Sequence, residues 1–269
     1  MQLKSRTPGA RPRWWLVLAL LASMALNIAL LGGLYLSFGK LQMARVFPLG
    51  IPLTPPPDPA AAALPKLVMI GDSRALMWRT GEFAACLDVS RIATGGHAST
   101  QVRLALAERL PPRGAVALVQ FGINDLHPLR AFPQYGDLVF ATLLDNLDRV
   151  TQTLLDNGNP VVLSTLFPPG PVPLWRRPFW DPRTPGYIEQ ANAHIRALAQ
   201  KPGVSLLDAH AVLTRQDGWI QESYADADFF LHVNAAGYAA LNRTLAPLLA
   251  GLYGADAVAA CQAGTRAAR

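Results

Sequence analysis

The longest uninterrupted apolar run in the chain restricts its fold more than any other feature. Residues 14–38 form a stretch of 25 residues without a charged side chain. As an α-helix this stretch is about 37 Å long, which exceeds the roughly 30 Å core of a bilayer. A cleavable signal peptide is the competing interpretation, but its apolar core usually holds only about 7 to 15 residues. We therefore predict one uncleaved transmembrane anchor at residues 14–38.

Basic residues beside this run predict its orientation. Residues 1–13 hold four basic side chains, and only Lys40 and Arg45 follow the run closely. By the positive-inside rule, residues 1–13 form a basic cytoplasmic tail, and the rest of the chain lies on the periplasmic or extracellular side of the inner (plasma) membrane. The formal net charge of +6 arises entirely within residues 1–47, which hold six basic and no acidic residues. Because the remainder is neutral overall, no nucleic-acid partner is expected.

Two further expectations concern the N-terminal part of the chain. Small residues recur at every fourth position of the apolar run, at Ala25, Ala29, Gly33 and Ser37. Such a stripe lets two helices approach closely, so dimerisation through the anchor is one interpretation and an ordinary apolar helix is the other. Residues 39–65 are rich in proline and alanine. That composition predicts a semi-rigid linker between the anchor and a folded domain.

From residue 66 onward, strand-like and helix-like stretches alternate. Five strands are expected at 66–70, 89–92, 115–121, 161–166 and 204–207, and helices at 73–85, 100–110, 136–157, 185–200 and 235–251. Such alternation predicts a parallel sheet with helices on both faces. We expect an α/β fold over residues 66–253, namely a three-layer α/β/α sandwich with a flavodoxin-like, five-stranded parallel sheet. Residues 254–269 are expected to form a C-terminal tail.

Residues suited to nucleophilic catalysis follow the predicted strands. Ser73 ends the sequence Gly-Asp-Ser after the first strand, where we expect it to cap a helix, and its hydroxyl needs a neighbouring base to attack a carbonyl. Asn124 follows the third strand, and Gly95 lies in a Gly-Gly pair after the second. The Asn124 amide and the backbone N–H groups of Ser73 and Gly95 are candidate donors to an oxyanion. His232, in the loop before a helix capped by Asn234, is the candidate base.

These residues, in this order, resemble the SGNH subgroup of the GDSL hydrolases over roughly residues 66–253. The resemblance implies that Ser73, Gly95, Asn124 and His232 are the four residues that name the subgroup. It usually includes an acid three residues before the histidine, where this chain has a phenylalanine. We expect Asp228 to orient His232, with Asp226 or a backbone carbonyl as the alternatives. No metal-ligand cluster, phosphate loop or dinucleotide fingerprint is visible, so no cofactor or metal is expected.

A loop at residues 167–185 leaves the fourth strand on the side where substrate should enter. It is rich in proline, aromatic residues and arginine. We expect it to form a wall of the substrate site, and a rigid surface loop is the alternative interpretation. The residues predicted to contact substrate are Asp72, His97, Trp175, Arg176 and Trp180.

Together these features predict a membrane-anchored serine ester hydrolase that acts on an envelope ester. The substrate would be a small-molecule, lipid or glycan ester, such as an O-acetyl glycan or a lipid acyl ester. An O-acyltransferase that uses the same serine with a glycan acceptor is one alternative, and a catalytically silent binding module is another. Cys86 and Cys261 are the only cysteines, and the predicted topology places both outside the cytosol. A disulfide that pins the C-terminal tail and a pair of free thiols both remain open.

Overall fold

The computed structural model describes residues 14–46, 64–226 and 230–255. The chain divides into two compact units, of which the first ends at Phe38 and the second begins at Gly39. Helix α1 (Trp14–Val46) provides the described part of the first unit. By length and composition α1 can cross a membrane, a property that it shares with signal sequences.

The last two turns of α1 belong to the second unit and pack against other residues of that unit. Gly39, Gln42 and Val46 are buried, and a Cβ at Gly39 would lie 2.6 Å from the Cβ of Ala131. Their spacing of three and four residues places them on one face of the helix. The start of the predicted linker at residues 39–65 is therefore helical and part of the folded unit. Residues 47–63 of that linker lie outside the described residues.

Five parallel strands form the centre of the second unit. They are β1 (Lys66–Gly71), β2 (Asp88–Ala93), β3 (Val116–Gln120), β4 (Val161–Ser164) and β5 (Val204–Leu207). Their order across the sheet is β2-β1-β3-β4-β5, and every neighbouring pair is parallel. This is the flavodoxin-like order, in which the direction of winding reverses between β1 and β3. The predicted α/β sandwich with a five-stranded parallel sheet is confirmed.

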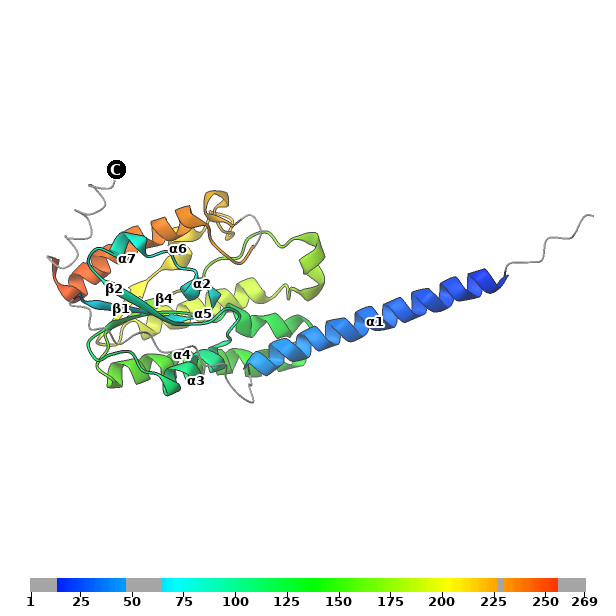
Figure 1. Cartoon of the computed structure of the whole chain (residues 1–269), viewed down its shortest axis with the longest axis horizontal. Coiled ribbons are helices and arrows are strands. Elements are labelled where there is room, and N and C mark those ends of the chain that lie inside the picture. Colours follow the sequence, from blue (N-terminus) through cyan, green and yellow to red (C-terminus); the bar gives the residue numbers. More distant parts are fainter. Residues whose placement is uncertain (1–13, 47–63, 227–229, 256–269) are drawn as a thin grey trace, which may run out of the picture. The chain divides into compact units, whose positions relative to one another are not determined.

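Alternate residues of each strand contribute to two separate cores. In β1, Val68 and Ile70 belong to one core, and Leu67 and Met69 belong to the other, because successive strand side chains point to opposite faces. Helices α3 (Ser99–Glu108), α4 (Gly136–Asp156) and α5 (Thr184–Leu198) bury their apolar residues in the first core. Helices α6 (Ala209–Leu213) and α7 (Ala235–Tyr253) do so in the second. Figure 1 shows α3 and α4 on one side of the sheet and α6 and α7 on the other.

The helix predicted over residues 73–85 is wrong beyond its first turn. Helix α2 (Ser73–Leu76) is short, and the 3-10 helix η1 (Gly81–Phe83) follows it. Between them Trp78 is fully buried and donates its Nε1–H to Oδ1 of Asn242 in α7 at 2.8 Å. Tertiary packing of this large side chain thus overrides the local helical pattern. The other 3-10 helices are η2 (Ile123–Arg130), η3 (Pro133–Tyr135), η4 (Leu174–Phe179) and η5 (Glu222–Tyr224).

The end of α7 is tied back to the sheet. The Tyr253 hydroxyl donates to the carbonyl of Lys66 at 2.5 Å and accepts from the backbone N–H of Val116 at 3.1 Å. Cys86 is buried and disulfide-bonded. Cys261, the second cysteine of the predicted bridge, lies outside the described residues, as does most of the predicted tail.

Candidate active site

The turn after β1 holds Ser73 at the C-terminal edge of the sheet. Gly71 has a φ of +151°, and a Cβ there would lie 1.8 Å from the carbonyl oxygen of Gln120 in β3, so only glycine fits this position. Asp72 is the N-cap of α2, and its Oδ1 accepts from the backbone N–H of Arg74 at 2.8 Å. The expectation that Ser73 caps the helix is wrong, because Ser73 is the first helical residue. Its hydroxyl is therefore not used as a cap.

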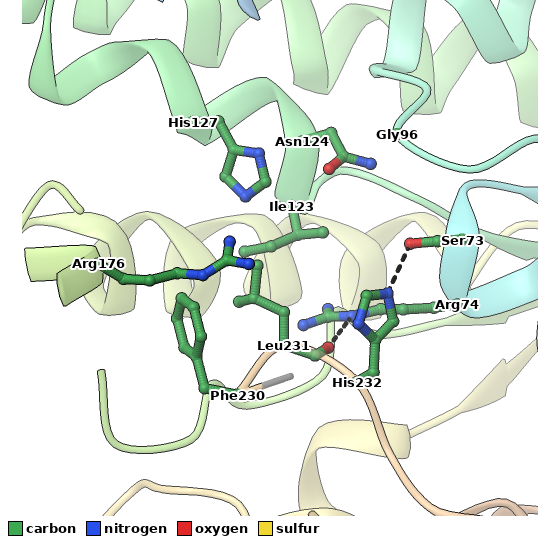
Figure 2. Close-up of a pocket in the computed structure, with 10 residues that line it drawn as sticks. All are labelled: Ser73, Arg74, Gly96, Ile123, Asn124, His127, Arg176, Phe230, Leu231 and His232. Atoms are coloured by element: carbon green, nitrogen blue, oxygen red, sulfur yellow. Dashed lines mark hydrogen bonds between the residues drawn. The ribbon is translucent and has the colours of Figure 1, made fainter. Parts of the chain in front are cut away.

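The serine and the histidine meet at this edge. Ser73 Oγ lies 2.9 Å from His232 Nε2, although 159 positions separate them in the chain (Figure 2). The backbone N–H of Asp226 donates to the His232 carbonyl at 3.1 Å, which holds the histidine's segment in place. Two residues later, Asn234 caps α7 as predicted, because its side chain accepts from Gly237 N–H at 3.0 Å. The structure thus joins the two residues whose roles were predicted from distant motifs.

Burial keeps His232 neutral. It lowers the pKa of His232 from 6.5 to about 4, and the positive charges of Arg74 and Arg176 act in the same direction. The charge of Asp226 raises the pKa and offsets part of this shift. A neutral imidazole at neutral pH can accept the proton of the serine hydroxyl.

Three groups are predicted as candidates to orient this imidazole, namely Asp228, Asp226 and a backbone carbonyl. Asp228, the predicted residue, lies within positions 227–229, outside the described residues. The alternative, Asp226, is described and lies beside His232 through the backbone hydrogen bond given above. The assignment of Asp228 stays a prediction.

Asn124, a predicted oxyanion donor, lies at the same cavity as the serine and the histidine. It lies in η2 and lines the same pocket as Ser73 and His232. Its Nδ2 donates to the His97 carbonyl at 2.9 Å. An amide nitrogen carries two hydrogens, and no residue in the described part of the chain accepts the second one. Gly95, the other predicted donor, is exposed and outside the pocket lining, where its neighbour Gly96 lies instead.

A buried carboxyl group fixes the Asn124 loop. Asp125 is fully buried and accepts from the Ser99 backbone N–H at 2.9 Å and from Ser99 Oγ–H at 2.6 Å. The same Oγ accepts from Asn146 in α4 at 2.9 Å. Burial raises the pKa of Asp125 to about 7, and its bonds to Ser99 oppose that rise. The network connects the loop after β3 with the start of α3 and the middle of α4, a role that the sequence did not indicate.

The site residues line a cavity of about 220 Å³. Of the residues predicted from sequence, Ser73, Asn124, Arg176 and His232 line it together (Figure 2). The lining also contains residues outside the set predicted to form the site, namely Arg74, Gly96, Ile123, His127, Phe230 and Leu231.

Four residues predicted to contact substrate lie outside this lining. Asp72 is fully buried in its capping role, and His97 is buried with its carbonyl bound to the Asn124 amide. Trp175 is 65% exposed and its ring lies under Arg176. Trp180 packs edge-on against Phe230, with 5.2 Å between the ring centroids. Sequence spacing alone does not reveal which side of a turn or loop faces the cavity.

His127 is the most informative of these residues, because the sequence places it just after a predicted active-site loop, where it could touch substrate. It follows Asn124 by three positions in a 3-10 helix, where residues three apart lie on the same side. Burial lowers the pKa of His127 to about 4, helped by the charges of Arg45, Arg74 and Arg176.

No metal site accompanies these groups in the part of the chain that the structure describes. Within residues 14–46, 64–226 and 230–255, no group of three or more His, Cys, Asp or Glu side chains could hold a metal ion.

Comparisons with known proteins bear on the family and the fold of this chain. The family model for the GDSL-like lipase/acylhydrolase family matches residues 73–240. Among solved structures, a Streptococcus pneumonia protein named for platelet activating factor is 20% identical, with a TM-score of 0.60, over 84% of this chain and 99% of its own. A GDSL-like lipase from Bacteroides thetaiotaomicron is 19% identical, with a TM-score of 0.55, over 78% and 96%. An acetyl-xylooligosaccharide esterase from Geobacillus is 16% identical, with a TM-score of 0.52, over 67% and 92%. A search of curated proteins found no match. At these identities the structural likeness establishes the fold.

Proposed function

Because this chain belongs to the GDSL-like lipase/acylhydrolase family, we propose that it hydrolyses esters through an acyl-enzyme on Ser73, as in the SGNH subgroup. The observation that carries this proposal is the distance of 2.9 Å between Ser73 Oγ and His232 Nε2. The pair lies beside the point between β1 and β3 at which the direction of winding reverses. Open α/β sheets bind their ligands at such a switch point.

The first half of the reaction forms the acyl-enzyme. His232 Nε2 takes the hydroxyl proton while Ser73 Oγ bonds to the acyl carbon, and the carbonyl electron pair moves onto the oxygen. The second N–H of the Asn124 amide and the backbone N–H of Ser73 stabilise the resulting oxyanion, and Gly95 N–H stays a further candidate. When the oxyanion collapses, the bond to the leaving alcohol breaks, and His232 returns its proton to that alcohol.

The second half releases the acid. The neutral His232 takes a proton from a water molecule, whose oxygen bonds to the acyl carbon. Collapse of this second oxyanion breaks the bond to Ser73, and the proton on His232 returns to Oγ. Asp228 is our candidate for the group that orients the imidazole through both halves, with Asp226 as the alternative.

We place this chemistry at a membrane. In support, α1 is long and apolar enough to serve as an anchor, and the basic residues at 1–13 favour a cytoplasmic N-terminus. The disulfide at Cys86 favours an oxidising compartment, which is the periplasmic or extracellular side. The cavity of about 220 Å³ is smaller than ordinary drug-sized pockets, so it encloses only a small part of a lipid or glycan ester, such as an acetyl group.

Labelling and hydrolysis with the full-length chain test the proposal. The wild-type protein in non-ionic detergent should react with a fluorophosphonate probe and hydrolyse p-nitrophenyl acetate and acetylated glycans. Ser73→Ala should lose both reactions, while Ser223→Ala, at an exposed site on η5, should keep both. Labelling without hydrolysis in the absence of an acceptor, but with acyl transfer to an added glycan, would identify an acyltransferase. Equal labelling of wild type and Ser73→Ala would refute the assignment of the nucleophile.

A further inference from the structure

The cavity beside Ser73 and His232 carries several positive charges. Arg176 lines it from η4, and Arg74 lines it from α2 (Figure 2). Arg45, at the end of α1, lies against Gly96 of the same lining, because a Cβ at Gly96 would be 3.0 Å from Arg45 Nη1. Gly96 has a φ of +76°, so glycine allows both the turn and the close approach of the guanidinium. Three guanidinium groups therefore lie in or beside one small cavity.

Arg176 is held by aromatic rings and has no carboxylate partner among the described residues. Its guanidinium carbon lies 4.5 Å from the ring centre of Trp175 and 5.7 Å from that of Phe230. No side chain in the described part of the chain accepts a hydrogen bond from this guanidinium, and none forms an ion pair with it. The contrast is with four other arginines that each contact an aspartate, namely Arg149, Arg183, Arg196 and Arg215. Stacking on rings positions a guanidinium, and its N–H edge stays available to the charged oxygens of a phosphate or carboxylate.

Arg45 and Arg74 add to the same positive field. Arg45 Nη1 donates to the neutral side chain of Gln42 at 3.1 Å, and within the described residues no carboxylate forms an ion pair with it. Arg74 is fully buried and donates its Nε–H to the Leu231 carbonyl at 2.9 Å. Its Nη1 and Nη2 have no hydrogen-bond partner in the described structure. Asp72 offsets part of the charge of Arg74, and because its terminal nitrogens are buried, Arg74 contributes positive charge to the cavity rather than an exposed donor.

The charges of these arginines lower the pKa values of the histidines in the site. Arg45 and Arg176 both contribute to the lowered pKa of His127, and Arg176 contributes to that of His232. The two arginines come from segments far apart in the chain, yet both act on one imidazole. Their fields therefore overlap inside the cavity.

We propose that Arg176, with Arg45 and Arg74 around the same cavity, binds a negatively charged group, a phosphate or a carboxylate, that the ester substrate carries. The inference rests on the proposed function, because it places the anion next to the bond that Ser73 attacks. A guanidinium matches such groups well, since two parallel N–H donors reach two oxygens. The substrate class is thus an anionic ester, and matched neutral esters are poorer substrates.

Matched pairs of substrates test this specificity in the full-length chain in non-ionic detergent. One pair is butyryl glycerol phosphate and butyryl glycerol, which places the charge on the alcohol side. The other is mono-p-nitrophenyl glutarate and p-nitrophenyl valerate, which places it on the acyl side. The measured quantity is the ratio of kcat/KM for the charged ester to that for the neutral one. In wild type this ratio should be about tenfold or more in at least one pair, as expected for a charge-assisted contact.

Arg176→Gln should reduce this ratio about tenfold. The matched control is Arg177→Gln, because Arg177 is the next residue of η4 but is exposed and outside the lining. The control should leave the ratio within about twofold of wild type, as an exposed charge contributes little. An unchanged ratio in Arg176→Gln, or a wild-type preference for the neutral ester in both pairs, would overturn the inference.

A binding measurement separates this inference from the proposed function. Butyl glycerol phosphate and butyl glycerol are ethers that cannot be hydrolysed, and calorimetry gives their affinities for wild type and Arg176→Gln. Tighter binding of the phosphate, lost in Arg176→Gln, supports anion recognition even when no ester is turned over and no fluorophosphonate reacts. Equal binding of both ethers to wild type refutes anion recognition, even when neutral esters are hydrolysed.

Discussion

Ester hydrolysis by this protein should persist well below pH 6, because His232 stays unprotonated there. Burial and two arginines lower the pKa of this imidazole from 6.5 to about 4. A general base works only when deprotonated, so kcat/KM falls as the pH drops through the pKa of the free enzyme. At pH 5 a base with a pKa of about 4 is about nine-tenths deprotonated, whereas an ordinary histidine is only about 3% deprotonated. The two cases differ about thirtyfold in rate at that pH.

The assay is kcat/KM for a neutral ester, butyryl glycerol, between pH 3.5 and 8, with released butyrate measured by chromatography. Because the substrate does not titrate, the acid limb reports the enzyme. Arg176→Gln should move the midpoint upward and Asp226→Asn should move it downward, since their charges act on His232 in opposite directions. Arg177→Gln should leave the midpoint in place.

A midpoint at or above 6.5 would refute this reasoning. It would mean that a carboxylate stabilises the imidazolium more than burial and the arginines destabilise it. If the midpoint then fell below 6.5 in Asp228→Asn, Asp228 would be the carboxylate that stabilises the imidazolium. If it fell below 6.5 in Asp226→Asn, that carboxylate would be Asp226.

Three further predictions concern single positions. Asn124→Ala should lower kcat by about 10² to 10³ with little change in KM, because it removes a donor to the oxyanion, and a loss below fivefold in steady-state kinetics would speak against this role. Gly71→Ala should destabilise the fold by about 3 kcal/mol or more in urea unfolding, because its Cβ would lie 1.8 Å from the Gln120 carbonyl oxygen at a φ of +151°. Gly95→Ala, which has no atom within 4 Å of the added Cβ, is the control and should unfold close to wild type. Cys86 should resist alkylation in the unfolded, non-reduced protein and react after reduction, and mass spectrometry that finds alkylation without reductant would contradict the disulfide.

The sequence predicted the sheet well because its strands are short apolar runs between helical patterns. Buried parallel strands need apolar residues on both faces, which produces a local signal that does not depend on distant contacts. The helix over residues 73–85 shows the limit of such signals, because the burial of Trp78 against α7 ends it after one turn. The end of the apolar run at Phe38 likewise does not mark the end of the helix. The uncharged apolar run stops there, but the helix continues to Val46, since Gln42 and Val46 are buried within the second unit.

By itself, the sequence determined the long apolar helix and the α/β class, and it singled out the serine, the asparagine and the histidine as candidates, because each of these inferences depends on residue type and local spacing. Only the tertiary structure brought Ser73 Oγ to 2.9 Å from His232 Nε2 across 159 positions, and placed Arg176 rather than Trp175 or Trp180 in the cavity. It also showed that Asp72 is a buried cap and that Arg45 lies against Gly96. These outcomes depend on which side of each loop faces the cavity, and packing between distant segments decides that.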